Sequence, residues 1–296
     1  MRLWERAAPA FACLTPCDRA LLHVLRDLHY LTCPQVHRAC YPGLSLSSVR
    51  ARLGELRRRR FLRWFRRDAF TDRRAFWGLA PLGRAAAGAL NAADAAPVRR
   101  DDPSTPRAGA IAALHLDHLI ETNDLFCALC EHARTRRLPP TLWLAGCRSV
   151  IDLDQTRLVP DAVVLAAAPD RGWWTYYLER DRGTMPPAAM RDKFERYTLL
   201  LKVACAQTDD PAWAARAGAW LLLACDDDRR AERLAALAVD SGIHRIWAGS
   251  AEACAAGLVA SLDGAGAPTE WPPPPVWAAG ALAIPLVDQL GEEDRR

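Results

Sequence analysis

Residues 158–184 read LVPDAVVLAAAPDRGWWTYYLERDRGT and contain two apolar runs that are typical of β-strands. The residues between the runs, Pro169 to Gly172, favour a tight turn. The pattern therefore predicts a β-hairpin. Its two strands carry three carboxylates, Asp161, Glu179 and Asp181, beside mostly apolar neighbours.

The length of the turn decides where these carboxylates lie. A three-residue loop over residues 169–171 places Asp161 opposite Glu179, and the alternative loop, shifted by one residue, places it opposite Asp181. Because side chains alternate along a strand, all three carboxylates then share one face. A two-residue loop would place Asp161 opposite Arg180 and break the group. Converging carboxylates need a neutralising cation, and Mg²⁺ or Mn²⁺ suits such oxygen ligands.

The N-terminal part of the sequence predicts three short helices followed by a hairpin. Thr15 and Thr32 are each followed closely by proline, which is a signal for the start of a helix. A third helix follows, with one apolar face formed by Val49, Leu53 and Leu56. Residues 63–79 alternate aromatic and charged residues on both sides of a polar turn, as a hairpin does. These elements predict a winged helix-turn-helix domain over residues 1–95.

Positive charge is concentrated in this part of the chain. Residues 50–74 contain eleven Arg and three acids, a local net charge of +8; the whole chain carries +4, so the remainder carries −4. In a winged helix the third helix enters the major groove through its N-terminal residues, and arginines elsewhere contact phosphates. We therefore predict binding of double-stranded DNA by Ser47, Ser48, Arg50, Arg52, Arg57, Arg58, Arg59, Arg60, Arg63, Arg66, Arg67, Arg73 and Arg74. The alternative is a solvated basic face used for protein contacts.

The rest of the chain is predicted to form a linker, a second domain and a tail. Residues 96–107 are rich in Pro and charge and are the expected linker. Residues 108–262 give the order α-β-β-β-α-β-α-β-α, which predicts a mixed sheet flanked by helices. Residues 263–296 form a Pro-rich C-terminal tail. The predicted fold class is α+β: a winged helix-turn-helix followed by an α/β domain.

Several motifs resemble a known family. PDAVV at residues 160–164, LERDRGT at 178–184 and KFERY at 193–197 are similar to the replication-relaxation family of plasmid and mobile-element proteins. More distantly, they resemble the PD-(D/E)XK nuclease superfamily. The N-terminal LTPCDRALL and FWGLAPLGRAAAG extend the resemblance to roughly residues 14–262. It implies a DNA-binding domain joined to a nuclease-like domain, acting in plasmid replication, DNA relaxation or mobilisation.

The resemblance also implies roles for individual residues. Asp161 would be the first metal ligand and Glu179 the second, whereas Asp181 joins the predicted metal site only through the alternation of the strand. The nuclease pattern has a Lys where this chain has Asp181, so Lys193 on the following helix would have to supply that cation. Tyr197, one helical turn further, would touch a phosphate. A complete site would act as a metal-dependent DNA endonuclease, whereas a degenerate one would bind DNA without cutting it.

Each residue of this site also has an ordinary structural interpretation. Asp161 would then only begin a strand, and Lys193 would be a solvated helix residue. Glu179 and Asp181 would form salt bridges with the neighbouring Arg180 and Arg182.

Composition narrows the location and the cofactors. The sequence has ten Cys and neither a signal peptide nor a spanning apolar segment, which favours a reducing cytoplasm and no membrane. The Cys and His spacings fall on predicted helices that need these positions for packing, so no zinc is expected.

Three functions remain open from the sequence. The first is a DNA-binding factor for plasmid replication or transfer, whose partners would include plasmid replication or relaxase proteins. The second is an active restriction or defence nuclease. The third is a transcriptional regulator whose C-terminal domain forms a homodimer.

Overall fold

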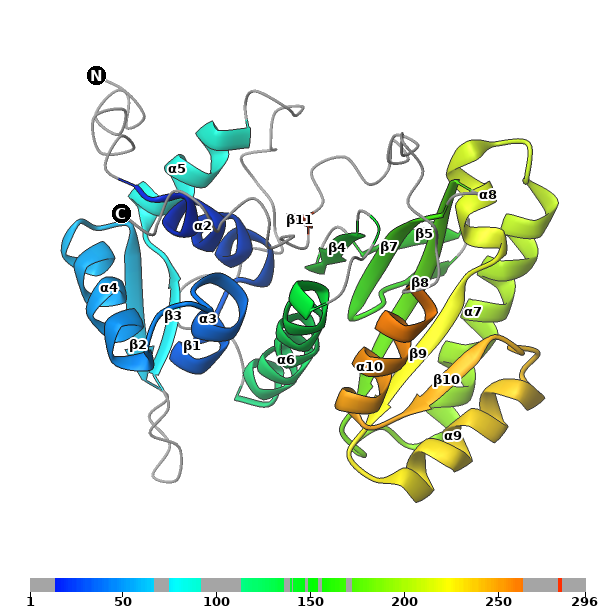
Figure 1. Ribbon diagram of the computed structural model, residues 1–296. Coiled ribbons are helices and arrows are strands. Elements are labelled where there is room, and N and C mark those ends of the chain that lie inside the picture. Colours follow the sequence, from blue (N-terminus) through cyan, green and yellow to red (C-terminus); the bar gives the residue numbers. More distant parts are fainter. Residues whose placement is uncertain are drawn as a thin grey trace. The chain divides into compact units, whose positions relative to one another are not determined.

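The computed structural model divides the chain into two units, residues 1–131 with 285–296 (unit 1) and residues 132–284 (unit 2) (Figure 1). The structure describes residues 14–66, 75–91, 113–135, 139, 141–146, 149–153, 156–168, 172–262 and 282–283. The predicted linker at residues 96–107 and most of the predicted tail lie outside the described residues.

Unit 1 contains helices and a small antiparallel sheet with the strand order β1-β3-β2. Its elements are α2 (Pro16–Leu28), β1 (Leu31–Thr32), α3 (Cys33–Cys40), α4 (Leu46–Arg58), β2 (Leu62–Arg66), β3 (Ala75–Leu79), α5 (Pro81–Asn91) and most of α6 (Ala113–Thr135). The three predicted helices and the predicted hairpin are confirmed. The sequence analysis missed β1, which is too short to show a periodic pattern.

The helix starts follow the predicted capping residues. Thr15 and Thr32 both form capping boxes, in which the threonine hydroxyl accepts a backbone N–H three residues on. In turn, the side chains of Asp18 and Gln35 accept a hydrogen bond from the backbone N–H of the capping residue. The predicted apolar face of α4 is fully buried, at Val49, Leu53 and Leu56.

Asp18 also holds the three helices together. Its carboxylate is fully buried and accepts hydrogen bonds from the Tyr41 hydroxyl at 2.7 Å and from Arg52 Nε at 2.8 Å. Burial alone would raise the pKa of this carboxyl, but the bonds from Arg52, Tyr41 and Thr15 outweigh burial and lower it. The charged form of Asp18 therefore stabilises unit 1.

Helix α6 packs on unit 1 over most of its length, whereas the sequence analysis placed it at the start of the second domain. Asn123 Nδ2 donates to the backbone oxygens of Leu28 and Tyr30, at 3.3 and 2.8 Å. Arg38 forms a two-pronged ion pair with Glu131, with N–O distances of 2.9 and 2.7 Å. The boundary between the units accordingly lies between residues 131 and 132 rather than before residue 108.

Unit 2 is a mixed sheet with the strand order β10-β9-β8-β7-β4-β11, which has five strands of four to ten residues and the two-residue β11 at one edge. The strands are β4 (Thr141–Ala145), β7 (Ala162–Ala168), β8 (Gly172–Asp181), β9 (Trp220–Cys225), β10 (Ile246–Gly249) and β11 (Leu282–Ala283). Strands β4, β7 and β8 pair antiparallel, and β8, β9 and β10 pair parallel. This confirms the predicted mixed sheet.

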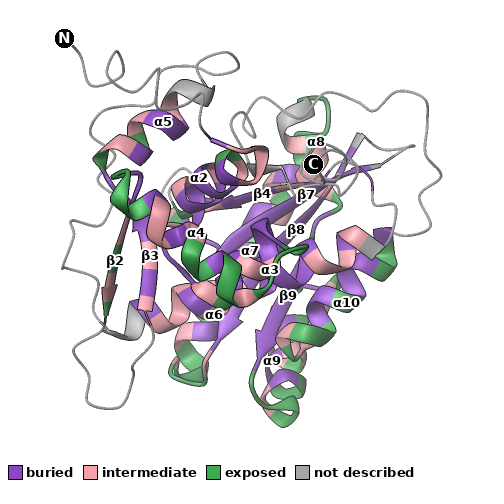
Figure 2. Cartoon of the chain, turned by 60° about the vertical axis from the view of Figure 1, so that its left-hand side comes forward, coloured by how far each residue is buried: buried purple, intermediate pink, exposed green. Residues whose placement is uncertain are grey.

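Helices cover both faces of this sheet, with α7 (Pro187–Ala206) and α9 (Asp228–Asp240) on one face and α10 (Ala251–Leu262) on the other (Figure 1). The central strands are almost wholly buried, while α9 and α10 keep exposed outer faces (Figure 2). An apolar core of the unit lies beneath α7 and α9.

The sequence analysis missed the short elements of unit 2. Two predicted strands are each two strands in the structure. The first is divided into β4 and β5 (Ile151–Leu153), and the second into β6 (Thr156–Leu158) and β7. Strands β5 and β6 pair with each other outside the main sheet. The short helix α8 (Pro211–Ala217) and strand β11 were also missed. These elements are too short for hydrophobic periodicity to identify.

We expect Asp18→Asn to destabilise unit 1 by about 2 kcal/mol, because Arg52 and Tyr41 lose a charged acceptor. Since folding lowers the pKa of Asp18, its contribution is present above the unfolded pKa and is lost as pH falls through the folded pKa. At neutral pH, amide hydrogen exchange in α2 should therefore be faster in Asp18→Asn than in the wild-type protein. The difference between the two should be smaller in acid. Asp240→Asn, at the exposed end of α9, is the matched control. Unchanged exchange in α2 would contradict this role of Asp18.

Candidate functional site

The hairpin of β7 and β8 sets the geometry of the acidic site. Its register pairs Ala162 with Leu178 and Ala168 with Gly172, which leaves residues 169–171 as the loop. This is the first of the two predicted three-residue loops. Continued by one residue, the register places Asp161 opposite Glu179.

Asp161 lies immediately before β7 and is tied to β8. Its backbone N–H donates to the Leu178 oxygen at 3.0 Å, and its Oδ2 accepts the backbone N–H of Arg180 at 2.7 Å. Its negative charge raises the pKa values of Glu179 and Lys193, as expected for groups that lie near one another. Asp161 therefore belongs to the same charged group as Glu179.

Glu179 is the buried centre of this group, with only 3% of its surface exposed. Lys193 Nζ donates to Oε2, and the Tyr197 hydroxyl donates to Oε1 at 2.5 Å. Burial raises the pKa of Glu179 to about 7; Lys193 opposes this rise and Asp161 adds to it. We refer to Asp161, Glu179, Lys193 and Tyr197 as the Glu179 cluster.

Helix α7 brings the other two members of the cluster to β8. It begins at Pro187, which suits the first helical position, and it buries Met190, Phe194 and Leu200 against the sheet. Lys193 and Tyr197 are four residues apart and therefore lie on the same side of the helix. The structure brings Lys193 to Glu179, and its predicted role at a phosphate stays a prediction. Tyr197 is only 1% exposed, so in this arrangement its hydroxyl serves Glu179 rather than a phosphate.

Asp181 is engaged by a different partner. Arg230 of α9 binds both of its oxygens, with Nη2 at 3.0 Å from Oδ1, and also donates to the Met185 oxygen at 2.9 Å. Gly183 donates its backbone N–H to Asp181 Oδ2 at 3.3 Å. Asp181 thus fixes the loop after β8 to α9, a role for which the local sequence has no signal because Arg230 is far along the chain.

The ion pairs differ from the ordinary interpretation of these acids. Glu179 pairs with Lys193 and Asp181 with Arg230, rather than with their sequence neighbours. Arg180 itself is buried; its Nη1 donates to the backbone oxygens of Asp181 and Ala224, at 2.9 and 3.1 Å.

The carboxylates fit a metal ion only in part. Asp161 and Glu179 bring together the oxygen ligands that Mg²⁺ or Mn²⁺ prefers, but Asp181 is held by Arg230. Across the described residues, no group of three His, Cys, Asp or Glu side chains is arranged to hold a metal. A metal ion bound by all three carboxylates stays a prediction, and it requires Asp181 to leave Arg230.

The predicted DNA-binding residues at the start of α4 lie mostly on the surface. Ser45 caps the helix, and its hydroxyl contacts the hydroxyls of Ser47 and Ser48, both at 2.8 Å. Ser47, Ser48 and Arg50 are exposed. Arg52 is different, because its guanidinium binds the buried Asp18 inside unit 1.

The arginines at the end of α4 and on β2 surround an exposed tryptophan. The guanidinium carbons of Arg57 and Arg66 lie 5.5 and 5.4 Å from the ring centre of Trp64, which is 38% exposed. The other arginines of this surface include Arg58 and Arg59, both paired with Glu55, the exposed Arg60, and Arg63, which donates to the Tyr30 hydroxyl. Arg67, Arg73 and Arg74 lie outside the described residues.

Arg60 has an unusual backbone conformation. Helix α4 ends with bonds from Phe61 N to Leu56 O and from Arg60 N to Arg57 O, both 2.9 Å, which is the pattern of a Schellman motif. Arg60 has φ of 62°, in the left-handed region that glycine normally occupies at this position. The chain therefore keeps a positive charge at a place where the backbone favours glycine.

These features define the class of the protein: an α+β chain with a basic helical unit and a mixed-sheet unit that holds a buried acidic cluster. A comparison with protein families matches residues 22–210, well over half of the chain, to the replication-relaxation family. The chain belongs to this family, as its motifs indicated. No curated protein and no solved structure matches it. None of the described helices is both long and apolar enough to span a membrane.

We expect Lys193→Met to destabilise unit 2 by about 3 kcal/mol at neutral pH, because Glu179 would be buried without its cation. The double variant Lys193→Met with Glu179→Gln should regain part of this loss. Urea unfolding would measure both changes. The only other lysine, Lys202, is exposed on the same helix, so Lys202→Met is the matched control and should have little effect. Equal effects of the two lysine substitutions would contradict the buried pair.

We expect Arg60→Gly to stabilise unit 1 by about 1 kcal/mol, because it removes a side chain from a left-handed backbone. Arg59→Gly removes the same charge from the C-cap position, where φ is −77°, and should not stabilise the unit. Thermal unfolding of the two variants would distinguish backbone strain from charge repulsion. Equal stabilisation by both would point to charge alone.

Proposed function

We propose that this chain binds double-stranded DNA through unit 1 and acts in the replication or DNA relaxation of a plasmid or mobile element. Membership of the replication-relaxation family supports the process. The order of elements from α2 to β3, α-β-α-α-β-β, is that of a winged helix-turn-helix and supports the mode of binding.

The observation that carries this proposal is the exposed basic surface of unit 1. Ser47, Ser48 and Arg50 occupy the start of α4, the part that enters the major groove in winged helices. Arg57 and Arg66 flank Trp64 on the adjoining hairpin, where guanidinium groups would contact phosphates. We therefore assign groove contacts to the start of α4 and backbone contacts to the hairpin. Arg52 acts as a support because it holds Asp18.

A second candidate function, metal-dependent nicking of DNA, is favoured by the Glu179 cluster. Strands β4, β7 and β8 pair antiparallel, and β9 returns parallel to β8 after α7. This order supports a PD-(D/E)XK-like interpretation of unit 2. Asp161 and Glu179 would hold Mg²⁺ or Mn²⁺, which supplies charge neutralisation at a phosphate and an activated water.

The protein groups of the cluster have their own chemical roles in this second function. Burial raises the pKa of Glu179 to about 7, so near neutral pH a metal ion would compete with a proton for this carboxylate. Lys193 places a positive charge beside it and would stabilise negative charge on a phosphate. Tyr197 holds one Glu179 oxygen and so orients the carboxylate.

We expect Arg50→Ala and Arg66→Ala each to weaken binding of duplex DNA and to reduce the slope of log affinity against log salt by about one. Fluorescence anisotropy over a series of salt concentrations would measure both effects. Arg233→Ala removes an exposed arginine from α9 of unit 2 and is the matched control. If all three variants behaved alike, the basic surface of unit 1 would not be the binding site.

We expect nicking of supercoiled plasmid to require Mg²⁺ or Mn²⁺ and to be lost in Asp161→Ala, while duplex binding is retained. Agarose gel electrophoresis separates nicked from supercoiled DNA, and EDTA gives the metal-free control. Binding without nicking under all metal conditions would reject the second function and leave the first intact. Nicking that survives Asp161→Ala would show that the Glu179 cluster is not its site.

A further inference from the structure

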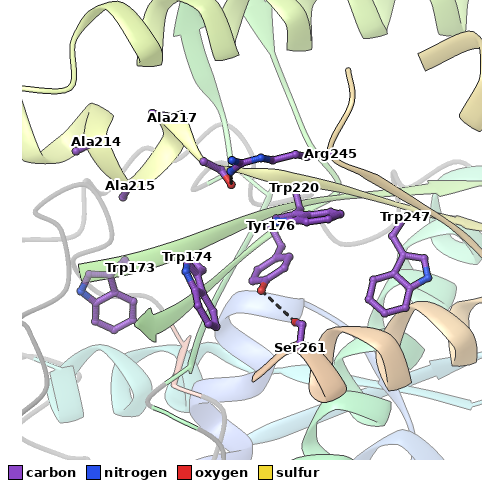
Figure 3. A pocket seen from close by; sticks show the side chains of 11 residues that line it. Trp173, Trp174, Tyr176, Ala214, Ala215, Ala217, Trp220, Arg245, Trp247 and Ser261 are labelled. Atoms are coloured by element: carbon purple, nitrogen blue, oxygen red, sulfur yellow. Dashed lines mark hydrogen bonds between the residues drawn. The ribbon is translucent and has the colours of Figure 1, made fainter. Parts of the chain in front are cut away.

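Unit 2 also contains a hollow lined by aromatic side chains. It lies at the opposite end of β8 from the Glu179 cluster. It has a volume of about 670 Å³. Trp174 and Tyr176 come from β8, Trp220 from the start of β9 and Trp247 from β10, with Arg245 beside Trp220 (Figure 3). The volume is in the range typical of small-molecule sites.

Two aromatic rings of this hollow are held in place, and a third is exposed. The Tyr176 hydroxyl is 3.1 Å from Ser261 Oγ of α10. The Trp247 ring lies against Gly257 so closely that a Cβ there would be 1.8 Å from it. Trp220 is 39% exposed. An exposed tryptophan beside rings that are held in place is suited to stacking against a planar ligand.

The charge of the hollow indicates what kind of planar ligand it fits. Among the lining residues that the structure describes, Arg245 is the sole charged side chain, and none of them is a carboxylate. Arg245 is exposed, and within the described part of the chain its side chain makes one hydrogen bond, from Nη1 to the Gly218 backbone oxygen at 2.7 Å. A guanidinium has five N–H donors, so others remain to bind an anion.

We propose that this hollow binds an unpaired nucleotide, with the base stacked on Trp220 or Trp247 and the phosphate bound by Arg245. Stacking on aromatic side chains beside a positive charge is how proteins hold single-stranded nucleic acid. A proline-rich peptide would use the aromatic rings but not the guanidinium, so the charge favours the nucleotide. The ligand is either a free mononucleotide or a nucleotide within a single strand. The proposal requires neither duplex binding by unit 1 nor cleavage by the Glu179 cluster.

The test measures binding of labelled oligothymidylate, which cannot form a duplex with itself. Trp220→Ala and Arg245→Gln should each weaken this binding about fivefold or more, since stacking on one aromatic ring accounts for at least that factor. Trp220→Phe should retain most of the affinity, because it keeps an aromatic face. Arg233→Gln, which removes an equivalent charge from α9, is the matched control. Circular dichroism would verify that each variant is folded.

Four further measurements identify the ligand and separate this proposal from duplex binding. Competition by thymidine 5′-monophosphate supports a mononucleotide site, and competition only by unlabelled oligothymidylate supports a strand site. Affinity for blunt duplex DNA should be unchanged in Trp220→Ala and Arg245→Gln. Unchanged oligothymidylate binding in both variants would overturn the proposal, as would binding of an oligoproline peptide in place of the oligonucleotide. Photocross-linking of 5-iododeoxyuridine strands should label β9 or β10, and labelling confined to unit 1 would also overturn it.

Discussion

The architecture of unit 2 depends on the pairing of β8 along both of its edges, antiparallel to β7 and parallel to β9. A strand held on both sides cannot shift its register, so the alternation of its side chains is fixed. Glu179 consequently points into the core beneath α7, although a buried carboxylate is costly. The hydrogen bonds from Lys193 and Tyr197 offset this cost, and they also fix how α7 lies on the sheet.

Buried ion pairs recur in both units and join elements that are distant in sequence. Asp18 pairs with Arg52, Glu179 with Lys193, and Asp181 with Arg230. Well-packed apolar residues can stabilise a protein as much as a buried ion pair does, so stability alone does not explain these choices. For Asp18 and Asp181 the ion pair positions a neighbouring helix. For Glu179 the nearby Asp161 adds a second negative charge, an arrangement that favours a chemical role for the Glu179 cluster.

The sequence predicted the elements whose signals are local. Thr15 and Thr32 marked two helix starts, and the turn at residues 169–172 predicted the hairpin that brings Asp161 to Glu179. The alternation of side chains along the strands was compatible with both three-residue loops, and only the observed strand pairing decides between them. The pairing of Asp181 with Arg230 was not predictable, because 49 residues separate the two and their contact depends on the packing of α9.

Two further features could not be predicted from local sequence patterns. Helix α6 is strongly helical in sequence, but nothing in its pattern says whether it packs on the unit before it or after it. The hollow lined by Trp174, Trp220 and Trp247 is assembled from strands that become neighbours only in the sheet. Contacts between residues far apart in the chain create both features, and such contacts are the least visible part of a fold in one sequence.

The protonation of Glu179 tests the central claim most directly, because its raised pKa follows from burial, to which Asp161 adds and which Lys193 opposes. Nuclear magnetic resonance of carbon-13-labelled glutamate side chains can follow each carboxyl group through a pH titration. The account predicts one glutamate with a pKa of about 7, well above the ordinary value of 4.5. The signal of this glutamate should be absent in Glu179→Gln. If the signal missing from Glu179→Gln titrates at the ordinary value in the wild-type protein, Glu179 is not the buried centre of the cluster.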